Sequence, residues 1–421
     1  MQKVTASIIT IGDELLIGQV IDTNSAWMSQ QLNNIGVWVQ HRVAVGDVRN
    51  DIRHALDEEG RRSDIILITG GLGPTADDIT KPLLCEYFGG RLIMHQPTLE
   101  HVTYLFEQVF KRPGAMLERN KKQAEVPDVC TVLKNERGTA PGMLFEKDGK
   151  VFISMPGVPH EMQGIMKDHV FELIRKRYSM PRIGHRTLLT AGQGESMLAE
   201  MIQSWEAALP TNIKLAYLPN YGMVRLRLTG MGEKEQVEHE LNKQFDLLKQ
   251  LVHAYLVTDE DIPMNEVVGR LLKALGKIVT TAESCTGGYI AHLLTSIPGS
   301  SAYFHGGVVS YDNRIKQHLL GVKAATISRY GAVSAETVTE MANGALALMQ
   351  TDYVIAVSGI MGPDGGSEDK PVGTVWVAVG NKDRIETKKL WFRFDRKRNI
   401  ELTAINALNL LRIFILTNGS A

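Results

Sequence analysis

The amino-acid sequence predicts an α/β protein of about three domains, and three observations support this prediction. The chain has 421 residues, which is too long for one core at roughly 150 residues per domain. Its hydrophobic fraction of 44% and charged fraction of 22% are typical of a globular chain. Short β-branched runs alternate with helical patterns, which favours parallel sheets covered by helices. We expect domains at residues 1–175, 176–257 and 258–421.

Charge and cysteine content exclude several classes of protein. Lys and Arg number 46 and Asp and Glu 47, so the net charge of −1 provides no overall field that attracts nucleic acid or anionic lipid. No apolar run approaches the roughly 20 residues of a membrane span, and Asp13 and Glu14 interrupt the stretch where a signal peptide would lie. The well-separated Cys85, Cys130 and Cys285 argue against a disulfide framework or a zinc ribbon. We expect a cytoplasmic protein without a membrane segment or direct nucleic-acid binding.

The first domain shows a strand–helix–strand order, which implies right-handed crossovers and a parallel sheet. Its expected strands are residues 4–11, 37–45 and 64–69, and its expected helices are residues 24–34, 51–59 and 161–178. The strand at 64–69, DIILIT, is continuously apolar and suits a buried position in a parallel sheet. Ligands of such sheets bind beyond the carboxyl ends of the strands.

A glycine-rich loop follows this buried strand, with the sequence TGGLGPTADDIT at residues 69–80. Gly70, Gly71 and Gly73 lack a Cβ atom, so their backbone can approach a phosphate and present N–H groups to it. Thr75 can cap the next helix or bond a phosphate oxygen. The spacing matches neither a P-loop nor a dinucleotide-binding fingerprint.

Carboxylates and an amide accompany the two loops at this edge of the sheet. Asp77 and Asp78 are adjacent hard oxygen ligands, of the kind that holds a divalent metal ion against phosphate. Glu14 and Asn24 lie in the loop after the first strand. Each residue alone also fits a structural role, as a charge at a helix N-terminus or as an N-cap. The two loops together favour a site for a phosphorylated ligand.

The middle segment predicts a small α+β module. A strand at 185–190 and a helix at 195–208 precede a hairpin of residues 213–218 and 224–229, and a charged helix at 233–252 follows. This order suits a KH-like or ferredoxin-like fold. The module has no GXXG loop and no aromatic set for stacking RNA bases, which favours a spacer role over RNA binding.

The third domain again alternates helices and strands. Its expected helices are residues 264–275, 287–295, 335–349 and 398–414. Its expected strands are residues 277–281, 307–311, 353–357, 374–379 and 388–394.

The sequence Ala282-Glu-Ser-Cys-Thr-Gly-Gly288 joins a strand of this domain to a helix. A serine at such a junction, here Ser284, has an exposed hydroxyl beside helix N–H donors that can stabilise an oxyanion. Cys285 is the rival nucleophile, because a thiol near a helix N-terminus can be activated, although a buried and inert thiol is commoner. No histidine lies in the local motif, so His292 or His305 could approach Cys285 only through the fold.

Candidate partners for Ser284 lie about 30 residues later along the chain, where Tyr311 ends a strand and Lys316 lies one turn into the following helix. A partly buried lysine with a lowered pKa can act as general base for a serine hydroxyl, and a tyrosine can relay the proton. The alternatives are an aromatic residue at the edge of the core and a lysine in solvent. The residues alone leave both alternatives open.

The N-terminal motifs resemble those of the CinA family. IGDELLIGQVIDTNSAW and TGGLGPTADDITK are similar to the family's molybdopterin-binding-like domain, as are residues 120–125, 138–142 and 155–162. The resemblance implies a metal-dependent ADP-ribose pyrophosphatase rather than an enzyme of molybdenum cofactor synthesis. It places Asp77 and Asp78 near the divalent metal and the diphosphate, with Glu14 and Asn24 nearby.

The C-terminal motifs resemble the nicotinamide-nucleotide amidohydrolase domain of the same family. They are AESCTGG, PGSSAYFHGGVVSYDNRIKQHLLGV, GAVS, SGIMGPDGG and KPVGTVWVAV. The resemblance implies Ser284 as nucleophile, Tyr311 and Lys316 as the activating pair, and no cofactor. It also implies a set of residues that bind the substrate or the oxyanion, namely Thr286, Gly287, Gly288, Gly359, Gly362, Gly365 and Gly366.

One loop departs from the family pattern, which is closer to TGIAGPGGG. Here Ser358, Met361 and Asp364 replace a Thr, an Ala and a Gly. Met361 and Asp364 add bulk and negative charge near the expected phosphate, which puts affinity in question more than chemistry.

We therefore expect an enzyme of pyridine-nucleotide recycling. It would hydrolyse nicotinamide mononucleotide to nicotinic acid mononucleotide and ammonia, and ADP-ribose to AMP and ribose 5-phosphate. The alternative is a competence- or damage-associated regulatory protein that binds a nucleotide or pterin and has only one active domain. The resemblance also implies a homodimer.

Overall fold

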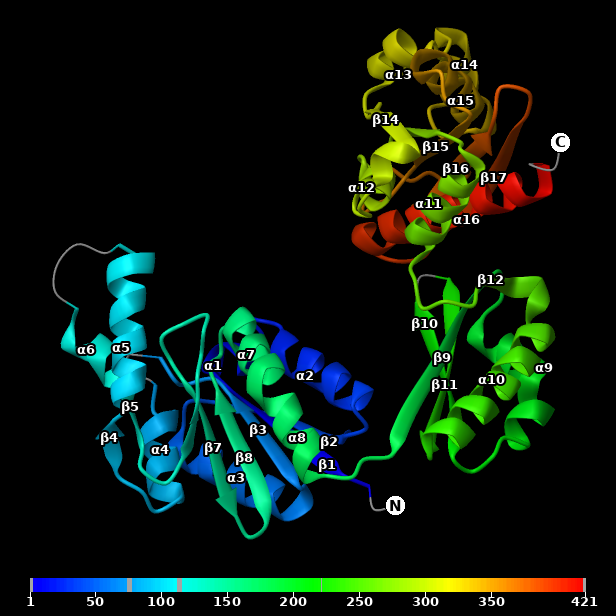
Figure 1. Ribbon diagram of the computed structural model, residues 1–421. Coiled ribbons are helices and arrows are strands. Elements are labelled where there is room, and N and C mark those ends of the chain that lie inside the picture. Colours follow the sequence, from blue (N-terminus) through cyan, green and yellow to red (C-terminus); the bar gives the residue numbers. More distant parts are fainter. Residues whose placement is uncertain (1–2, 74–77, 112–115, 221, 419–421) are drawn as a thin grey trace. The chain divides into compact units, whose positions relative to one another are not determined.

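The structure is a computed structural model, which describes residues 3–73, 78–111, 116–220 and 222–418 (Figure 1). The chain forms two compact units. One comprises Met1–Gly184 and Gly230–Glu240, and the other comprises His185–Thr229 and Leu241–Ala421. The second unit therefore contains most of the middle module together with the C-terminal domain. The predicted α/β fold class is confirmed in both units.

A six-stranded sheet forms the centre of the first unit. From edge to edge its strands are β2 (Trp38–Val45), β1 (Thr5–Ile11), β3 (Ile65–Thr69), β8 (Lys150–Met155), β7 (Gly142–Lys147) and β6 (Thr131–Leu133). The first four are parallel, whereas β7 and β6 are antiparallel to their neighbours. The expected parallel sheet is thus confirmed for four strands, and two antiparallel strands extend it.

Helices cover both faces of this sheet. They are α1 (Asp13–Leu16), α2 (Thr23–Asn34), α3 (Arg49–Arg62), α4 (Thr80–Tyr87), α7 (Pro159–Ile165) and α8 (Phe171–Arg177). Ile8 and Leu67 pack with α2, α7 and α8, whereas Ile9 and Ile68 pack with α3 and α4. Because successive strand residues point to opposite faces, a strand buried on both faces reads as a continuous apolar run. A π-helical turn, Met166–Val170, joins α7 to α8 within the expected helix 161–178.

A smaller subdomain follows α4. It contains β4 (Leu92–Met94), α5 (Gln96–Tyr104), a π-helical turn (Leu105–Val109), α6 (Glu118–Lys121), a short 3₁₀ helix (Lys122–Ala124) and β5 (Glu125–Pro127). β4 and β5 pair antiparallel.

The middle module has the predicted β-α-β-β-α order. Its elements are β9 (Arg182–Ala191), α9 (Glu195–Ala207), β10 (Ile213–Asn220), β11 (Met223–Gly232), α10 (Lys234–Leu251) and β12 (Leu256–Thr258). The sheet order is β10-β11-β9-β12. The strands extend beyond the predicted ranges, and β12 pairs with β9 as a fourth strand that the sequence pattern did not indicate.

The C-terminal domain has a five-stranded sheet in the order β14-β13-β15-β16-β17. Its strands are β13 (Val279–Glu283), β14 (Phe304–Val309), β15 (Tyr353–Gly359), β16 (Thr374–Gly380) and β17 (Ile385–Trp391). Its helices are α11 (Met264–Leu275), α12 (Tyr289–Thr295), α13 (Asn313–Leu320), α14 (Ala324–Tyr330), α15 (Ala335–Met349) and α16 (Arg396–Asn418). β13 is parallel to β14 and β15, and β16 is antiparallel to both of its neighbours.

Two apolar clusters lie on the two faces of this sheet. One contains Leu272 of α11 and Leu408 of α16, and the other contains Met341 of α15 and Leu320 of α13. Helix α16 is long and apolar enough to cross a membrane by length and composition alone, since an 18-residue window of it has a mean hydropathy of 1.5. Its inner face, including Leu408 and Leu411, is buried in the core of the domain.

Candidate active sites

The turn after β13 presents Ser284 at the carboxyl end of a central strand. β13 continues to Glu283, two residues beyond its predicted end, and Ser284 follows at once. The Ser284 amide donates a hydrogen bond to the carbonyl of Val357 on β15 at 3.0 Å, which fixes the turn to the sheet. Gly287 and Gly288 have φ values of 61° and 96°, a left-handed conformation that glycine adopts readily. These two glycines allow the chain to reverse sharply into α12.

Lys316 lies beside Ser284 in the interior of the domain. Its Nζ donates to the Ser284 Oγ at 3.0 Å, across 32 residues of sequence. It also donates to the carbonyls of Ser310 at 2.7 Å and Tyr311 at 3.2 Å. Only 1% of Lys316 and 7% of Ser284 is exposed. The alternative of a lysine in solvent is therefore wrong.

Burial shifts the pKa of the candidate base, Lys316, and that of the rival nucleophile, Cys285, in opposite directions. It lowers the pKa of the Lys316 amine below the ordinary lysine value, so the neutral form that can accept a proton becomes more accessible. It raises the pKa of the Cys285 thiol to about 12, which disfavours the reactive thiolate. His305 is exposed, and the His292 ring stacks on Tyr289. The geometry therefore favours Ser284 over Cys285.

Glu283 accepts hydrogen bonds from two groups that the family resemblance implies as substrate ligands, the Thr286 hydroxyl and the Gly288 amide. This buried carboxylate accepts the Thr286 hydroxyl at 2.7 Å and the amides of Gly288 at 3.1 Å, Ile290 at 3.0 Å and Ala291 at 2.8 Å. It caps α12 where the helix dipole favours a negative charge. The Thr286 side chain and the Gly288 amide are thus engaged within the protein.

Other amides of the turn remain for an oxyanion. The Gly287 amide donates to the Ser284 carbonyl at 3.1 Å. Among the residues that the structure describes, the amides of Cys285 and Thr286 have no backbone acceptor. They directly follow Ser284, the candidate nucleophile, in the turn, where donors for an oxyanion are expected.

Tyr311 is not placed as a relay between Ser284 and Lys316. Its side chain is 61% exposed, and its hydroxyl accepts from a guanidinium nitrogen of Arg396 at 2.9 Å. Only its carbonyl contacts Lys316. Arg396, the first residue of α16, donates its other terminal nitrogen to the carbonyl of Gly362 at 2.9 Å. Arg396 therefore connects the Tyr311 hydroxyl to the loop after β15 that contains Gly362.

Arg396 is not among the predicted site residues, because no local sequence motif surrounds it. It lies in a charged stretch, Asp395-Arg396-Lys397-Arg398, that resembles an ordinary solvated helix start. Its role depends on contacts with residues 34 and 85 positions away.

The loop after β15 carries the remaining predicted glycines. Gly359 ends β15 and pairs with Val375, whereas Gly365 and Gly366 are exposed. Met361 is buried, and its carbonyl accepts from Asn399 of α16 at 3.2 Å. Asp364 is exposed, so the added negative charge faces solvent while the added bulk of Met361 lies in the core.

In the first unit, a cavity of about 140 Å³ lies at the carboxyl ends of β1 and β3 and is lined by Glu14, Asn24, Gly70 and Gly157. The Asn24 Nδ2 donates to the carbonyl of Gly157 at 2.7 Å, while its Oδ1 is buried without a hydrogen-bond partner. A Cβ atom at Gly70 would collide with the Ile11 carbonyl oxygen, so only glycine fits there. The structure thus brings together three of the predicted ligand-binding residues.

The described part of the glycine loop contains three further predicted residues, Gly71, Gly73 and Asp78. The Asp78 Oδ1 accepts from the Gly73 amide at 2.8 Å, which holds the carboxylate against the glycine loop. Gly71 packs against Thr80. The predicted residues Thr75 and Asp77 lie outside the described residues.

Lys81 is an additional charged group at this loop. It is buried, and its Nζ donates to the carbonyls of Lys122 at 3.2 Å and Gln123 at 3.1 Å. Burial lowers the pKa of Lys81 to about 8, although Glu125 and Asp78 oppose the shift. The motif that contains the adjacent aspartates ends at this lysine, but its burial could not be read from the motif.

The donor set of this region suits a hard cation. Within the part of the chain that the structure describes, no cluster of three or more His, Cys, Asp or Glu side chains forms a complete metal site. Glu14 is exposed at the cavity, and the buried Asn24 carbonyl oxygen has no hydrogen-bond donor among the described residues. Such oxygens are the ligands that Mg²⁺ and similar ions prefer when phosphate supplies further ligands.

Three family models match consecutive parts of the chain. The "Probable molybdopterin binding domain" matches residues 7–176, the "Damage-inducible protein CinA KH domain" matches residues 185–256, and the "CinA C-terminal domain" matches residues 261–415. The KH-like interpretation of the middle module is thereby confirmed.

Relatives are similar along nearly the whole chain. A CinA-like protein from Cytophaga hutchinsonii is 47% identical over 408 residues, which is 97% of each chain. A CinA-like protein from Flavobacterium psychrophilum is 43% identical over 417 residues, which is 99% of each chain. Because this similarity extends across all three matched segments, the chain belongs to the CinA family.

Proposed function

We propose that the C-terminal domain is a serine amidohydrolase that converts nicotinamide mononucleotide to nicotinic acid mononucleotide and ammonia. The observation that carries this proposal is the buried Lys316 amine at 3.0 Å from the Ser284 hydroxyl. A serine is a weak nucleophile unless a base takes its proton, and a lysine with a lowered pKa is such a base. The pyridine-nucleotide substrate is proposed from the family resemblance.

The two carbonyls around Lys316 orient its amine for this task. A neutral amine keeps two N–H bonds, which can remain on the Ser310 and Tyr311 carbonyls. Its lone pair then faces the Ser284 hydroxyl. The proton that leaves Ser284 moves to Lys316 as the oxygen attacks the carboxamide carbon, and the same proton passes to the departing ammonia. Water then hydrolyses the ester on Ser284, with Lys316 as base, and releases the carboxylate product.

Two further groups complete this proposal. The amides of Cys285 and Thr286 are proposed to bind the oxyanion of each tetrahedral intermediate. Arg396 is proposed to bind the substrate phosphate, since it is held at the loop by Gly362 and Tyr311 and guanidinium suits phosphate recognition. Tyr311 then acts as a residue that positions Arg396.

For the N-terminal domain, we propose hydrolysis of ADP-ribose to AMP and ribose 5-phosphate. The glycine loop and the cavity beside it are proposed to hold the diphosphate, with the buried Asn24 oxygen accepting a hydroxyl of the ligand. Asp78 and Glu14, together with Asp77, would hold a divalent ion, which supplies polarisation of a phosphoryl oxygen when bound. The protonated Lys81 amine interacts electrostatically with Asp78, and its positive charge offsets part of the negative charge of the aspartates in the loop.

We also propose a homodimer. β14 is an edge strand of its sheet, and the neighbouring Val309 and Leu319 are half exposed. An uncovered edge with apolar side chains is a surface that proteins commonly pair. A solution mass equal to that of one 46.6 kDa chain at micromolar concentration would contradict this proposal.

A single experiment tests both activities in the full chain. Ammonia release from nicotinamide mononucleotide and AMP release from ADP-ribose are measured for the wild type, Ser284→Ala and Asp78→Asn. We expect each variant to lose one activity and to keep the other. If neither substrate is turned over by the wild type, the regulatory alternative is favoured; if only one is, a single domain is active.

A further inference from the structure

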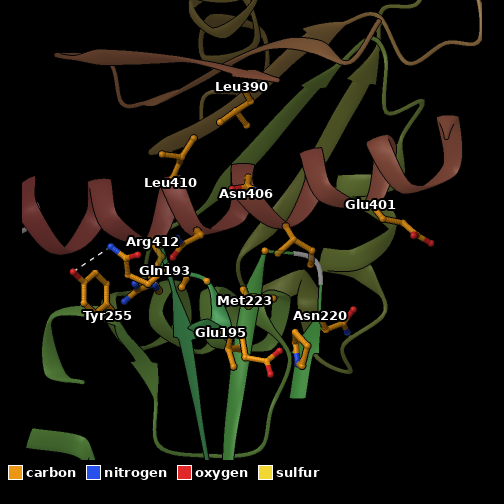
Figure 2. Close-up of a pocket in the computed structure, with 18 of the residues that line it drawn as sticks. Gln193, Glu195, Asn220, Met223, Tyr255, Leu390, Glu401, Asn406, Leu410 and Arg412 are labelled. Carbon is orange, nitrogen blue, oxygen red and sulfur yellow. Dashed lines mark hydrogen bonds between the residues drawn. The ribbon is translucent and has the colours of Figure 1, made fainter. Parts of the chain in front are cut away.

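A large cleft in the second unit lies between the middle module and helix α16 (Figure 2). Its volume is about 1050 Å³, which is at the upper end of the range for small-molecule sites. The loop between β9 and α9 and the end of β10 form one wall, and the outer face of α16 forms the other. None of the proposed catalytic residues lines it.

Arg412 lines one end of this cleft, and no carboxylate of the described residues pairs with it. Arg412 is half-buried, and its Nε donates to the Asn409 side chain at 3.1 Å. Burial is the one influence on its pKa, which it lowers, and no carboxylate opposes that effect among the described residues. A guanidinium removed from water without a counter-charge is costly, and a bound anion would relieve that cost.

Uncharged donors accompany Arg412 at the same end. Figure 2 shows Gln193 and Tyr255 on the Arg412 side of the cleft, with the Gln193 Nε2 donating to the Tyr255 hydroxyl at 3.4 Å. Gly192 and Gly194 flank Gln193, and Gly194 is the N-cap of the 13-residue helix α9 without a side-chain cap. The first N–H groups of α9 are therefore not satisfied by a capping side chain, and the glycines permit close approach of a phosphate.

The opposite end of the cleft carries acceptors. Figure 2 shows Glu401 and Asn220 there, with Glu195 on the same wall as Asn220. Glu401 and Arg412 are eleven residues apart on α16, which is about 16 Å along a helix. A ligand that spans the cleft therefore meets Arg412 at one end, and at the other it meets the oxygens of Glu401 and Asn220 beside the cations Lys397 and Arg398.

We propose that this cleft binds a mononucleotide whose base carries an amino group, with its phosphate at Arg412 and its base toward Glu401 and Asn220. Tyr255 offers an aromatic surface beside the phosphate end, and the amides of Asn406 and Asn409 line the wall between the two ends. The lining contains three carboxylates, Glu195, Asp395 and Glu401, and besides Arg412 it contains the cations Lys388, Lys397 and Arg398. Asp395 is already engaged with the amide of Arg398 at 3.0 Å.

A ligand bound in the cleft would affect the amidohydrolase site through α16, the helix that the two sites share. The same helix begins with Arg396, which contacts Gly362 and Tyr311. A ligand that ties α16 to the middle module therefore restrains the residue that is proposed to bind the substrate phosphate. This consequence rests on the proposed function, whereas the binding site itself does not.

Binding is tested by calorimetry on the full chain, with AMP as the probe and inorganic phosphate as a second arm. We expect Arg412→Gln to weaken one class of AMP sites by about tenfold or more, because it loses a charge-assisted contact. Arg384→Gln serves as the control, since Arg384 is an exposed residue that pairs with Glu386 outside the cleft. Inorganic phosphate should bind more weakly than AMP and compete with it. Isotherms that are identical for the wild type and Arg412→Gln would overturn the proposal.

Location is tested by hydrogen–deuterium exchange. AMP should slow amide exchange in the peptides that contain Gln193–Ser196 and Asn406–Ile413, and Gln193→Ala should reduce this protection if Arg412→Gln does not fold. Protection confined to the glycine loop near Asp78 or to the Ser284 turn would assign AMP to the catalytic sites and overturn the proposal.

The regulatory consequence has its own readout. Without AMP, Arg412→Gln should have the same amidohydrolase rate as the wild type. With AMP, the variant should lack the change in rate that arises from binding in the cleft, and should keep only the change that arises from competition at the substrate site. Competition at the substrate site is the same in both proteins, so an identical AMP response would contradict the coupling while leaving the calorimetric result in place.

Discussion

The two candidate active sites differ in whether their proposed functional groups already contact one another in the absence of a ligand. In the C-terminal domain, Lys316 and Ser284 are buried and already in hydrogen-bond contact. In the N-terminal domain, Glu14 is exposed, and the Asn24 oxygen has no partner. One site has its reacting groups in place before a ligand arrives, whereas the other presents groups whose charge and hydrogen bonds a ligand and a cation would satisfy.

This difference follows from the chemistry that each site is proposed to perform. A base must be desolvated to lower its pKa, so Lys316 is held in the interior by three acceptors that offset the cost of burial. Ligands for a hard cation must instead stay accessible and charged, since the ion and the diphosphate complete the coordination. Variants at the two sites should therefore behave differently, and the following predictions test that contrast.

The largest effect is expected at the Ser284–Lys316 pair. Ser284→Ala and Lys316→Met should each lower kcat for nicotinamide mononucleotide by about a thousandfold or more, and the double variant should lose little beyond either, because the two act as one unit. Ammonia release measures the rate, and circular dichroism checks the fold. Cys285→Ala is the control and should remain active. Activity that survives in Ser284→Ala but disappears in Cys285→Ala would assign the nucleophile to the thiol.

A smaller effect is expected at the open N-terminal site. Asp78→Asn keeps the shape of the side chain and removes its charge, so it should slow ADP-ribose hydrolysis by about 10- to 100-fold and raise the metal concentration required. AMP release over a titration with Mg²⁺ or Mn²⁺, before and after chelation, measures both. Asp148→Asn is the matched control, because Asp148 has a φ of 51° that asparagine tolerates and lies in the β7–β8 turn. Equal activity in both variants would remove Asp78 from the metal site.

The third prediction concerns the pH dependence of kcat/KM for the amide substrate at the Ser284–Lys316 site. Neutral Lys316 is the proposed base, so kcat/KM for the amide should fall by about tenfold per pH unit below its pKa and level off above it. Because burial lowers that pKa, the limb should lie below the ordinary lysine value of 10.5. The Tyr311→Phe variant should keep the same limb, which identifies the amine as the titrating group. A rate that continues to rise toward pH 12 would instead point to the Cys285 thiol.

The smallest effect is expected at the exposed edge of the C-terminal site. Arg396→Gln should raise KM for nicotinamide mononucleotide by about tenfold with little change in kcat, since the phosphate is distant from the reacting amide. Tyr311→Phe should raise KM by only about twofold, because it removes one hydrogen bond to Arg396. Arg393→Gln is the control at a nearby exposed position, where the guanidinium stacks on Trp391. A large loss of kcat in Tyr311→Phe would restore the proton-relay role.

Most regular elements could be predicted because their signals are local. The continuous apolar run of β3 and the helical periodicity of α9 and α11 lie within short windows, and the structure has them within a few residues of the expected ranges. The short strands β4, β6 and β12 have only three residues each and exist because partners pair with them. Such strands leave too little pattern to recognise.

The candidate sites were less predictable because their residues meet across long distances in sequence. Ser284 and Lys316 were both singled out, but whether the lysine was buried was open. The role of Glu283 as the cap of α12 lies within a predicted motif, yet the motif did not distinguish a structural carboxylate from a functional one. Arg396 contacts residues of two distant loops and had no local signature.

By itself, the sequence determined that this chain is an α/β protein of the CinA type, with a serine at a strand–helix junction and a glycine- and aspartate-rich loop at a sheet edge. These properties depend on residue type, spacing and periodicity, which act over a few neighbouring residues. Only the tertiary structure decided that Lys316 is desolvated against Ser284 and that the Tyr311 hydroxyl contacts Arg396. Burial and pKa depend on what packs around a group in space, and that packing brings together segments that are remote along the chain.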